Sequence, residues 1–85
     1  MSIGLYVLFY NSLGDVMKLR IKDLREDNDL TQKEIAKILM CDQSLYSKYE
    51  RGEREIPLNL LIILADYYNT NLDYLVYRTN NPEII

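Results

Sequence analysis

The stretch TQKEIAKILMCDQSLYSKYERG, from Thr31 to Gly52, contains the start and stop patterns of two short helices. Thr31 and Glu34 have the capping-box spacing, in which each side chain accepts a hydrogen bond from the other residue's backbone N–H. Four apolar residues at helical spacing give the first helix one buried side: Ile35, Ala36, Ile38 and Leu39. Met40 and Cys41 then make a tight connection to the next element.

The second helix of the stretch is predicted between Asp42 and Gly52. Aspartate is a favoured N-cap residue, and glycine commonly ends a helix in the left-handed conformation. Tyr46 and Tyr49 are three residues apart and therefore share one face of the helix. On that inward face, the two rings fit a core position better than a base-stacking role. The opposite face is polar and exposed.

One helix is predicted before this pair. Apolar residues at helical spacing begin near Met17 and form a single stripe, made of Leu19, Ile21, Leu24 and Leu30. The run Asp27-Asn28-Asp29 is typical of a helix end followed by a turn. We expect the stripe to face the same core as the inner sides of the two central helices.

Two further helices are predicted after the pair. Pro57 in or near a first turn starts one of them, and the segment from Leu58 to Tyr68 is so apolar that burial on more than one side is expected. Asn69 or Asn71 then breaks the helix and caps a last short one, which is marked by Leu72, Leu75 and Val76.

These patterns predict one all-α domain of five helices over residues 17–79, between an apolar extension (1–16) and a polar tail (80–85). A chain of this size has a thin core and depends on tight packing or a partner chain. The apolar run from Ile3 to Tyr10 is too short to cross a bilayer, which takes about 20 residues. No basic residue precedes it, unlike in a signal peptide. We therefore expect a cytoplasmic protein without membrane contact.

The composition argues against catalysis and metal binding. The chain has no His, and its one cysteine, Cys41, has no partner for a disulfide and no companions for a zinc site. Carboxylates lie beside Lys and Arg, the pattern of solvated helix faces. We expect no enzymatic activity, no cofactor and no metal, and we interpret Cys41 as a small, partly buried residue and not as a redox sensor.

Two short helices joined by a tight turn are the elements of a helix-turn-helix. The strings LTQ (30–32), YERG (49–52), IP (56–57) and DYL (73–75), at these spacings, resemble the phage Cro/C1-repressor (XRE-type) family of bacterial helix-turn-helix regulators. The resemblance covers about residues 17–79 and implies a five-helix, lambda-repressor-like fold. It also implies a sequence-specific transcriptional regulator, expected to be a repressor that binds operator DNA as a homodimer, with the helix Asp42–Arg51 in the major groove.

Transferred to this chain, the resemblance implies a set of residues that contact double-stranded DNA. Gln43 can pair with adenine N6 and N7, Leu45 can touch a thymine methyl group, and Lys48 can reach guanine or a phosphate. Phosphate contacts are expected at the start of the first helix of the pair, because helix N-termini favour anions. The complete expected set is Gln32, Lys33, Asp42, Gln43, Ser44, Leu45, Ser47, Lys48, Arg51 and Arg54.

Other positions that match the family are structural, and one departs from it. Arg25 and Glu50 occupy positions that form a salt bridge in the family, so neither charge would face DNA. The family often has Gly where this chain has Met40, and a left-handed backbone costs a non-glycine residue about 1 kcal/mol or more. Beyond the second helix of the pair, only Arg51 and Arg54 remain to contact phosphate.

The acidic net charge does not exclude DNA binding. The chain has a formal net charge of −3 and a pI near 4.8. Nine basic and eight acidic residues lie between Lys18 and Arg54, which gives that stretch +1, whereas the rest of the chain carries −4. Fields decay over about 8 Å at physiological salt, so the local sign decides. We expect weak non-specific DNA binding with a modest salt dependence.

Several alternatives remain at the level of the sequence. Gln43, Ser44 and Ser47 can be ordinary surface residues, and Lys48 and Arg54 can be solvated charges. The same fold can also serve as a protein-interaction module, of the antitoxin or anti-repressor type, that binds a regulatory protein.

The sequence also offers candidates for a dimer contact. An exposed apolar patch on a small domain suggests a partner, and the candidates on the last two helices are Ile63, Tyr67, Tyr74 and Tyr77. The β-favouring residues of segment 1–16 can pair with a second copy as a strand, can cover the surface of Ile63 and Tyr67, or can have no dimer role.

Overall fold

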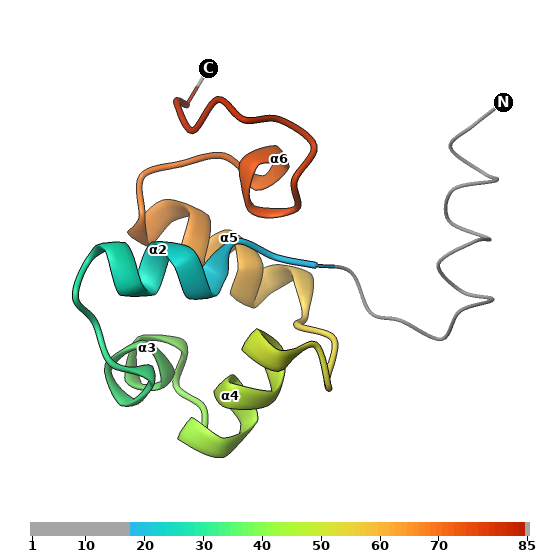
Figure 1. Cartoon of the computed structure of the whole chain (residues 1–85). Helices are drawn as coiled ribbons and strands as arrows, with labels where there is room; N and C mark the ends of the chain where they lie inside the picture. Colours follow the sequence, from blue (N-terminus) through green and yellow to red (C-terminus); the bar gives the residue numbers. More distant parts are fainter. Residues whose placement is uncertain (1–17, 85) are drawn as a thin grey trace, which may run out of the picture.

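The computed structural model describes residues 18–84, and within that range the chain forms helices and no strands. Their bounds are α2 Ile21–Asp27, α3 Gln32–Leu39, α4 Gln43–Arg51, α5 Leu58–Tyr67 and α6 Leu72–Leu75. The prediction of an all-α fold with five helices is confirmed. Figure 1 shows the pair α3–α4 at one end of the domain and α6 with the C-terminal segment at the other.

Every helix contributes to a single core. Helix α3 packs against α4 and α5, and α6 packs against α5. The buried apolar residues include both tyrosines predicted to face inward, together with residues from all five helices and the connection before α5: Ile21, Ile35, Ala36, Leu39, Tyr46, Tyr49, Ile56, Leu61, Leu64, Ala65 and Leu75. Ala36 lies where α3 meets its neighbours, and a larger side chain there would hold the helices apart.

The helix ends of the central pair match the sequence patterns. The Glu34 N–H donates to Thr31 Oγ1 at 3.1 Å, and the Thr31 N–H donates to Glu34 Oε1 at 2.8 Å, so the capping box is complete. Helix α4 ends at Gly52 with a φ of 72°. Met40 ends α3 with a φ of 58°, which confirms the left-handed turn at a residue that is not glycine. Its side chain is 92% exposed, so no packing offsets that backbone cost.

Two details of the predicted helices were wrong. The first helix begins at Ile21 and not near Met17, because the Arg20 N–H is directed away from any helical partner and donates to the Leu75 carbonyl at 2.9 Å. Leu19 therefore lies outside the helix, although it still packs against the core. Asp42 occupies the N-cap position of α4, but its side chain makes no capping hydrogen bond.

An arginine fastens the C-terminal segment to the domain. The Arg20 Nε donates to the Tyr74 carbonyl at 2.6 Å, and its Nη2 donates to the Thr79 carbonyl and to Asn80 Oδ1. The guanidinium also lies 4.3 Å from the centre of the Tyr74 ring and 4.1 Å from that of Tyr77. Such contacts combine charge-assisted hydrogen bonds with cation–π attraction.

Further hydrogen bonds hold the last residues. Thr70 Oγ1 donates to the Pro82 carbonyl at 2.6 Å, and the Asn71 side-chain amide donates to the carbonyls of Asn81 and Glu83. Asn71 also caps α6 by accepting from the Tyr74 N–H at 2.7 Å. The sequence predicted only a polar tail here, whereas residues 80–83 are bonded to the domain.

We predict that Arg20→Ala lowers the free energy of unfolding by about 2 kcal/mol, since it removes charged hydrogen bonds to partly buried carbonyls and two ring contacts. Urea unfolding followed by circular dichroism measures the effect. Lys22→Ala, an exposed neighbour on α2, is the matched control and should change stability by less than about 0.5 kcal/mol. Equal effects of the two variants would contradict a fastening role for Arg20.

Candidate nucleic-acid interface

Six of the ten predicted DNA-contact residues lie around one shallow depression on the surface of α3 and α4. It has a volume of about 400 Å³ and is lined by Gln32, Gln43, Ser44, Ser47, Lys48 and Arg51. Gln32 comes from the first turn of α3, and the other five come from α4. The lining is polar and includes two cations and no carboxylate.

The other four predicted residues lie outside this depression. Lys33 and Asp42 are exposed at the starts of α3 and α4. Leu45 is half-buried and packs against the core, which leaves only part of its side chain facing outward. Arg54 lines a different, apolar groove together with Ile56 and Leu58.

A buried carboxylate joins the helices beneath this surface. Arg25 on α2 donates to both oxygens of Glu50, with Nε–Oε2 at 2.6 Å and Nη2–Oε1 at 3.1 Å. Gln32 Nε2 donates to Glu50 Oε1 at 3.0 Å, and Arg25 Nη1 donates to the Leu30 carbonyl. The side chain of Glu50 is only 2% exposed, so this ion pair is shielded from water. The salt bridge implied by the family resemblance is present.

The charges of this network stabilise one another. Burial alone would raise the pKa of Glu50, but the hydrogen bonds from Arg25 and Gln32 more than offset it and hold the pKa below its ordinary value. The same hydrogen bond raises the pKa of Arg25. Both groups are therefore charged at neutral pH. The bidentate pair joins α2 to α4, and the Gln32 hydrogen bond joins α3 to the same carboxylate.

The cations on the outer face of α4, exposed Arg51 and half-buried Lys48, have weaker attachments than Arg25. Arg51 donates to Glu53 at 2.7 and 3.1 Å and to the Ser47 hydroxyl. The Arg51–Glu53 pair is about half exposed on both sides, and such surface pairs contribute little stability, so a phosphate can replace the carboxylate. Lys48 forms no ion pair with any residue between 18 and 84.

Two of the acidic residues outside the stretch 18–54 lie away from the central pair, whereas Glu55 follows shortly after α4. Asp73 lies on α6 and Glu83 in the C-terminal segment, at the end of the domain away from α3 and α4 (Figure 1). Salt screens the interaction of exposed charges with distance, so charges at that end weaken DNA binding at α4 less than charges on α4 itself would.

The comparison with known families agrees with this geometry. Residues 21–75, which include all five helices, match the helix-turn-helix family HTH_3. The chain belongs to the XRE-type helix-turn-helix family. Helices α3 and α4 are therefore the two helices of the motif, which in this family is a motif of DNA binding and transcription regulation.

Curated proteins similar to this member of the family include regulators and an antitoxin. YobD of Bacillus subtilis, an uncharacterized HTH-type transcriptional regulator, is 33% identical over 64 residues, covering 75% of this chain and 57% of YobD. The control protein C.SmaI of Serratia marcescens is 29% identical over 69 residues, covering 81% of this chain and 82% of its own length. The antitoxin PezA of Streptococcus pneumoniae is 35% identical over 51 residues, covering 60% of this chain and 32% of PezA.

The chain thus spans little more than half the length of YobD and about a third of PezA. A comparison with solved structures gave no match. None of the named relatives is described as an enzyme. In the part of the chain between 18 and 84, no helix is long and apolar enough to cross a membrane, and no three His, Cys, Asp or Glu residues are grouped to hold a metal ion.

We predict that Glu50→Gln lowers the stability at pH 7 by about 3 kcal/mol, because it leaves the largely buried Arg25 with only the exposed carboxylate of Glu26, 3.9 Å away, as a counter-charge. The folded pKa of Glu50 is depressed, so its contribution is fully present above the unfolded pKa of about 4.3 and is lost as the pH falls through the folded pKa. The difference between the variant and the original chain should therefore shrink as the pH falls below about 4.

Urea unfolding at pH 7 and at acid pH measures both effects. Glu53→Gln is the matched control, because Glu53 also pairs with an arginine at 2.7 Å but is exposed, and it should change stability little at either pH. A Glu50→Gln difference that is constant with pH would contradict the ionic role of Glu50.

Proposed function

We propose that this protein is a transcriptional repressor of a bacterium or phage, acting in the cytoplasm, that inserts α4 into the major groove of operator DNA as a homodimer. The observation that supports it most is the gathering of Gln43, Ser44, Ser47 and Lys48 with Gln32 around one polar depression. A recognition helix needs side chains of this kind on a single outward face.

In this proposal, the start of α3 binds the DNA backbone. The capping box uses the Glu34 N–H, while the N–H groups of Gln32 and Lys33 point out of the first turn and can bind a phosphate. The Gln32 amide donates one hydrogen to Glu50 and retains a second for the same phosphate. Glu50 therefore orients a phosphate contact without touching DNA.

The face of α4 supplies the base contacts. Gln43 is exposed in the first turn, where a bidentate pair with adenine fits its amide. Ser44, Ser47 and Lys48 follow on the same depression, and Arg51 at the end of α4 can exchange Glu53 for a phosphate. Leu45 contributes only the outward part of its half-buried side chain. Lys33 and Asp42 adjoin this surface at the starts of α3 and α4, whereas Arg54 lines the separate apolar groove.

The dimer contact is proposed on the exposed face of α5. Ile63 is 39% and Tyr67 46% exposed, and the rings of Tyr67 and Tyr68 pack edge to face with their centroids 5.2 Å apart. The Arg20 guanidinium already packs on one face of the Tyr74 and Tyr77 rings, so only their outer edges can contribute to a dimer contact. A two-fold dimer would read half-sites about 34 Å apart.

We predict that selection from a random duplex library at about 0.15 M salt enriches a two-fold symmetric sequence. Gln43→Ala should lose the preference at one base pair of each half-site, by roughly 1–3 kcal/mol, because a bidentate contact is removed. Asn59→Ala, an exposed polar position on α5, is the matched control and should select the original sequence. No enrichment by the folded protein would contradict the proposal.

A second function, protein binding of the antitoxin type, is supported by the similarity to PezA and by the exposed apolar residues of α5. Ile63→Glu separates the two. For a DNA-binding dimer, we predict that this variant sediments as a monomer and binds the symmetric site at least about 10-fold more weakly, since an unpaired charge is costly in an apolar contact. If DNA binding and mass are unchanged, α5 is available to a different protein.

A further inference from the structure

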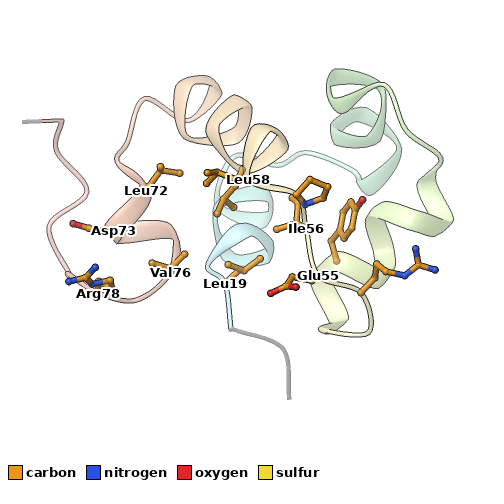
Figure 2. Close-up of a pocket in the computed structure, with 12 residues that line it drawn as sticks. Leu19, Glu55, Ile56, Leu58, Leu72, Asp73, Val76 and Arg78 are labelled. Carbon is orange, nitrogen blue, oxygen red and sulfur yellow. The ribbon is translucent and has the colours of Figure 1, made fainter. Parts of the chain in front are cut away.

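An apolar groove lies on the side of the domain where the described chain begins. It has a volume of about 620 Å³ and runs between Leu19, the connection after α4, the start of α5, and α6. Figure 2 shows the side chains of Leu19, Leu58 and Val76 around it, with Glu55 beside Leu19 and with Asp73 and Arg78 on the side of α6. The lining is mostly apolar, and its charged residues, Arg54, Glu55, Asp73 and Arg78, are two of each sign.

The groove leaves apolar side chains in contact with water. Leu58, in the first turn of α5, is 64% exposed, and Leu72, Val76 and Leu19 are each only half-buried. The groove has no converging polar groups on its floor to orient a small polar ligand. Its shape and chemistry suit an uncharged, apolar stretch of polypeptide.

The chain contains such a stretch next to the groove. The segment IGLYVLFY, Ile3–Tyr10, has no charged residue and lies outside the described residues. Seven residues, Asn11–Met17, join it to Lys18, and seven residues can span up to about 25 Å. Leu19, two positions beyond that connection, already forms one wall of the groove. A short tether of this kind gives an effective concentration on the order of millimolar.

We propose that Ile3–Tyr10 folds back in its own chain and fills this groove. The segment then covers Leu58 and packs against Val76, and because it is uncharged it brings no further charge into the groove. It also lies against Glu55 and Ile56, in the connection that leaves the motif helix α4, and so supports that connection from behind. This inference does not depend on DNA binding.

The proposal gives the two faces of α5 different partners. Leu58 and Ile63 are five residues apart, so at 3.6 residues per turn they lie about 140° apart around α5. Ile63 does not line the groove. One of the three alternatives that the sequence left open was that segment 1–16 covers Ile63 and Tyr67. The geometry favours the Leu58 side, because the described chain begins beside the groove.

Disulfide capture in the full chain tests this placement. All variants carry Cys41→Ser, so that only the introduced cysteines can react. Leu8→Cys is combined with Leu58→Cys in one variant and Val7→Cys with Leu58→Cys in another. The two segment positions are both needed because side chains alternate between the two sides of an extended segment. A disulfide needs Cα atoms within about 7 Å, so it reports proximity. The matched control combines Leu8→Cys or Val7→Cys with Ile63→Cys, which is also on α5 and exposed. A glutathione buffer and mass spectrometry measure the product.

For either position 7 or position 8, we expect the intrachain disulfide to position 58 to form at least about 10-fold more readily than the disulfide from the same position to position 63. Equal yields for positions 58 and 63 would overturn the proposal. A product with the mass of two chains would also overturn it, since the occupant would then be the segment of a second copy.

A second measurement does not use cysteines. Leu8→Asp should lower the urea midpoint of the original chain but not that of the Leu58→Asp variant, because the groove contact is already lost there. If Leu8→Asp lowers the urea midpoint equally in the original chain and in the Leu58→Asp variant, Leu8 and Leu58 are not in contact and the proposal is contradicted. Leu58 is largely exposed, so its substitution leaves the core intact.

Discussion

The buried carboxylate of Glu50 is the constraint on which the arrangement of the motif depends. A charge that is 98% shielded from water is tolerated only when it is paired and hydrogen-bonded, and here the partners come from α2 and α3 while Glu50 itself is on α4. The bidentate geometry of the Arg25 pair fixes direction as well as distance. The outer faces of α3 and α4 are consequently presented as one surface, and the residues around their common depression keep a constant spacing.

The chain is acidic and yet belongs to a DNA-binding family. The two facts are compatible because no carboxylate lines the polar depression of α3 and α4. The polar depression is lined by Lys48 and Arg51 without a carboxylate, and Glu50 is neutralised by Arg25 below it. Asp73 and Glu83 lie at the far end of the domain. A surface of this kind gains little from long-range attraction, so affinity for DNA would depend on direct contacts in the groove.

Local patterns predicted local structure well. The capping box at Thr31, the left-handed Gly52 and the inward tyrosines follow from short-range rules, whereas the left-handed position at Met40 and the Arg25–Glu50 pair were implied by the family resemblance. The fastening by Arg20 was missed because its partners lie 54 to 60 residues away and two are backbone carbonyls, which leave no trace in side-chain patterns. The half-buried state of Leu45 was missed for a related reason, since it depends on tertiary packing against the core. The ten candidate DNA-contact residues were named from the sequence. That six of them surround one depression depends on how α3 and α4 pack against each other, which the sequence patterns do not give.

The central claim is that DNA is bound by α3 and α4 and that α5 and α6 stay free of it. Titration of the ¹⁵N-labelled protein with a duplex obtained by selection, followed by amide chemical shifts, tests this residue by residue. The account predicts that the largest shifts occur at Gln32, Lys33 and the first two turns of α4, with little change in α6. Shifts concentrated in α5 or α6, with the amides of α4 unchanged, would contradict it.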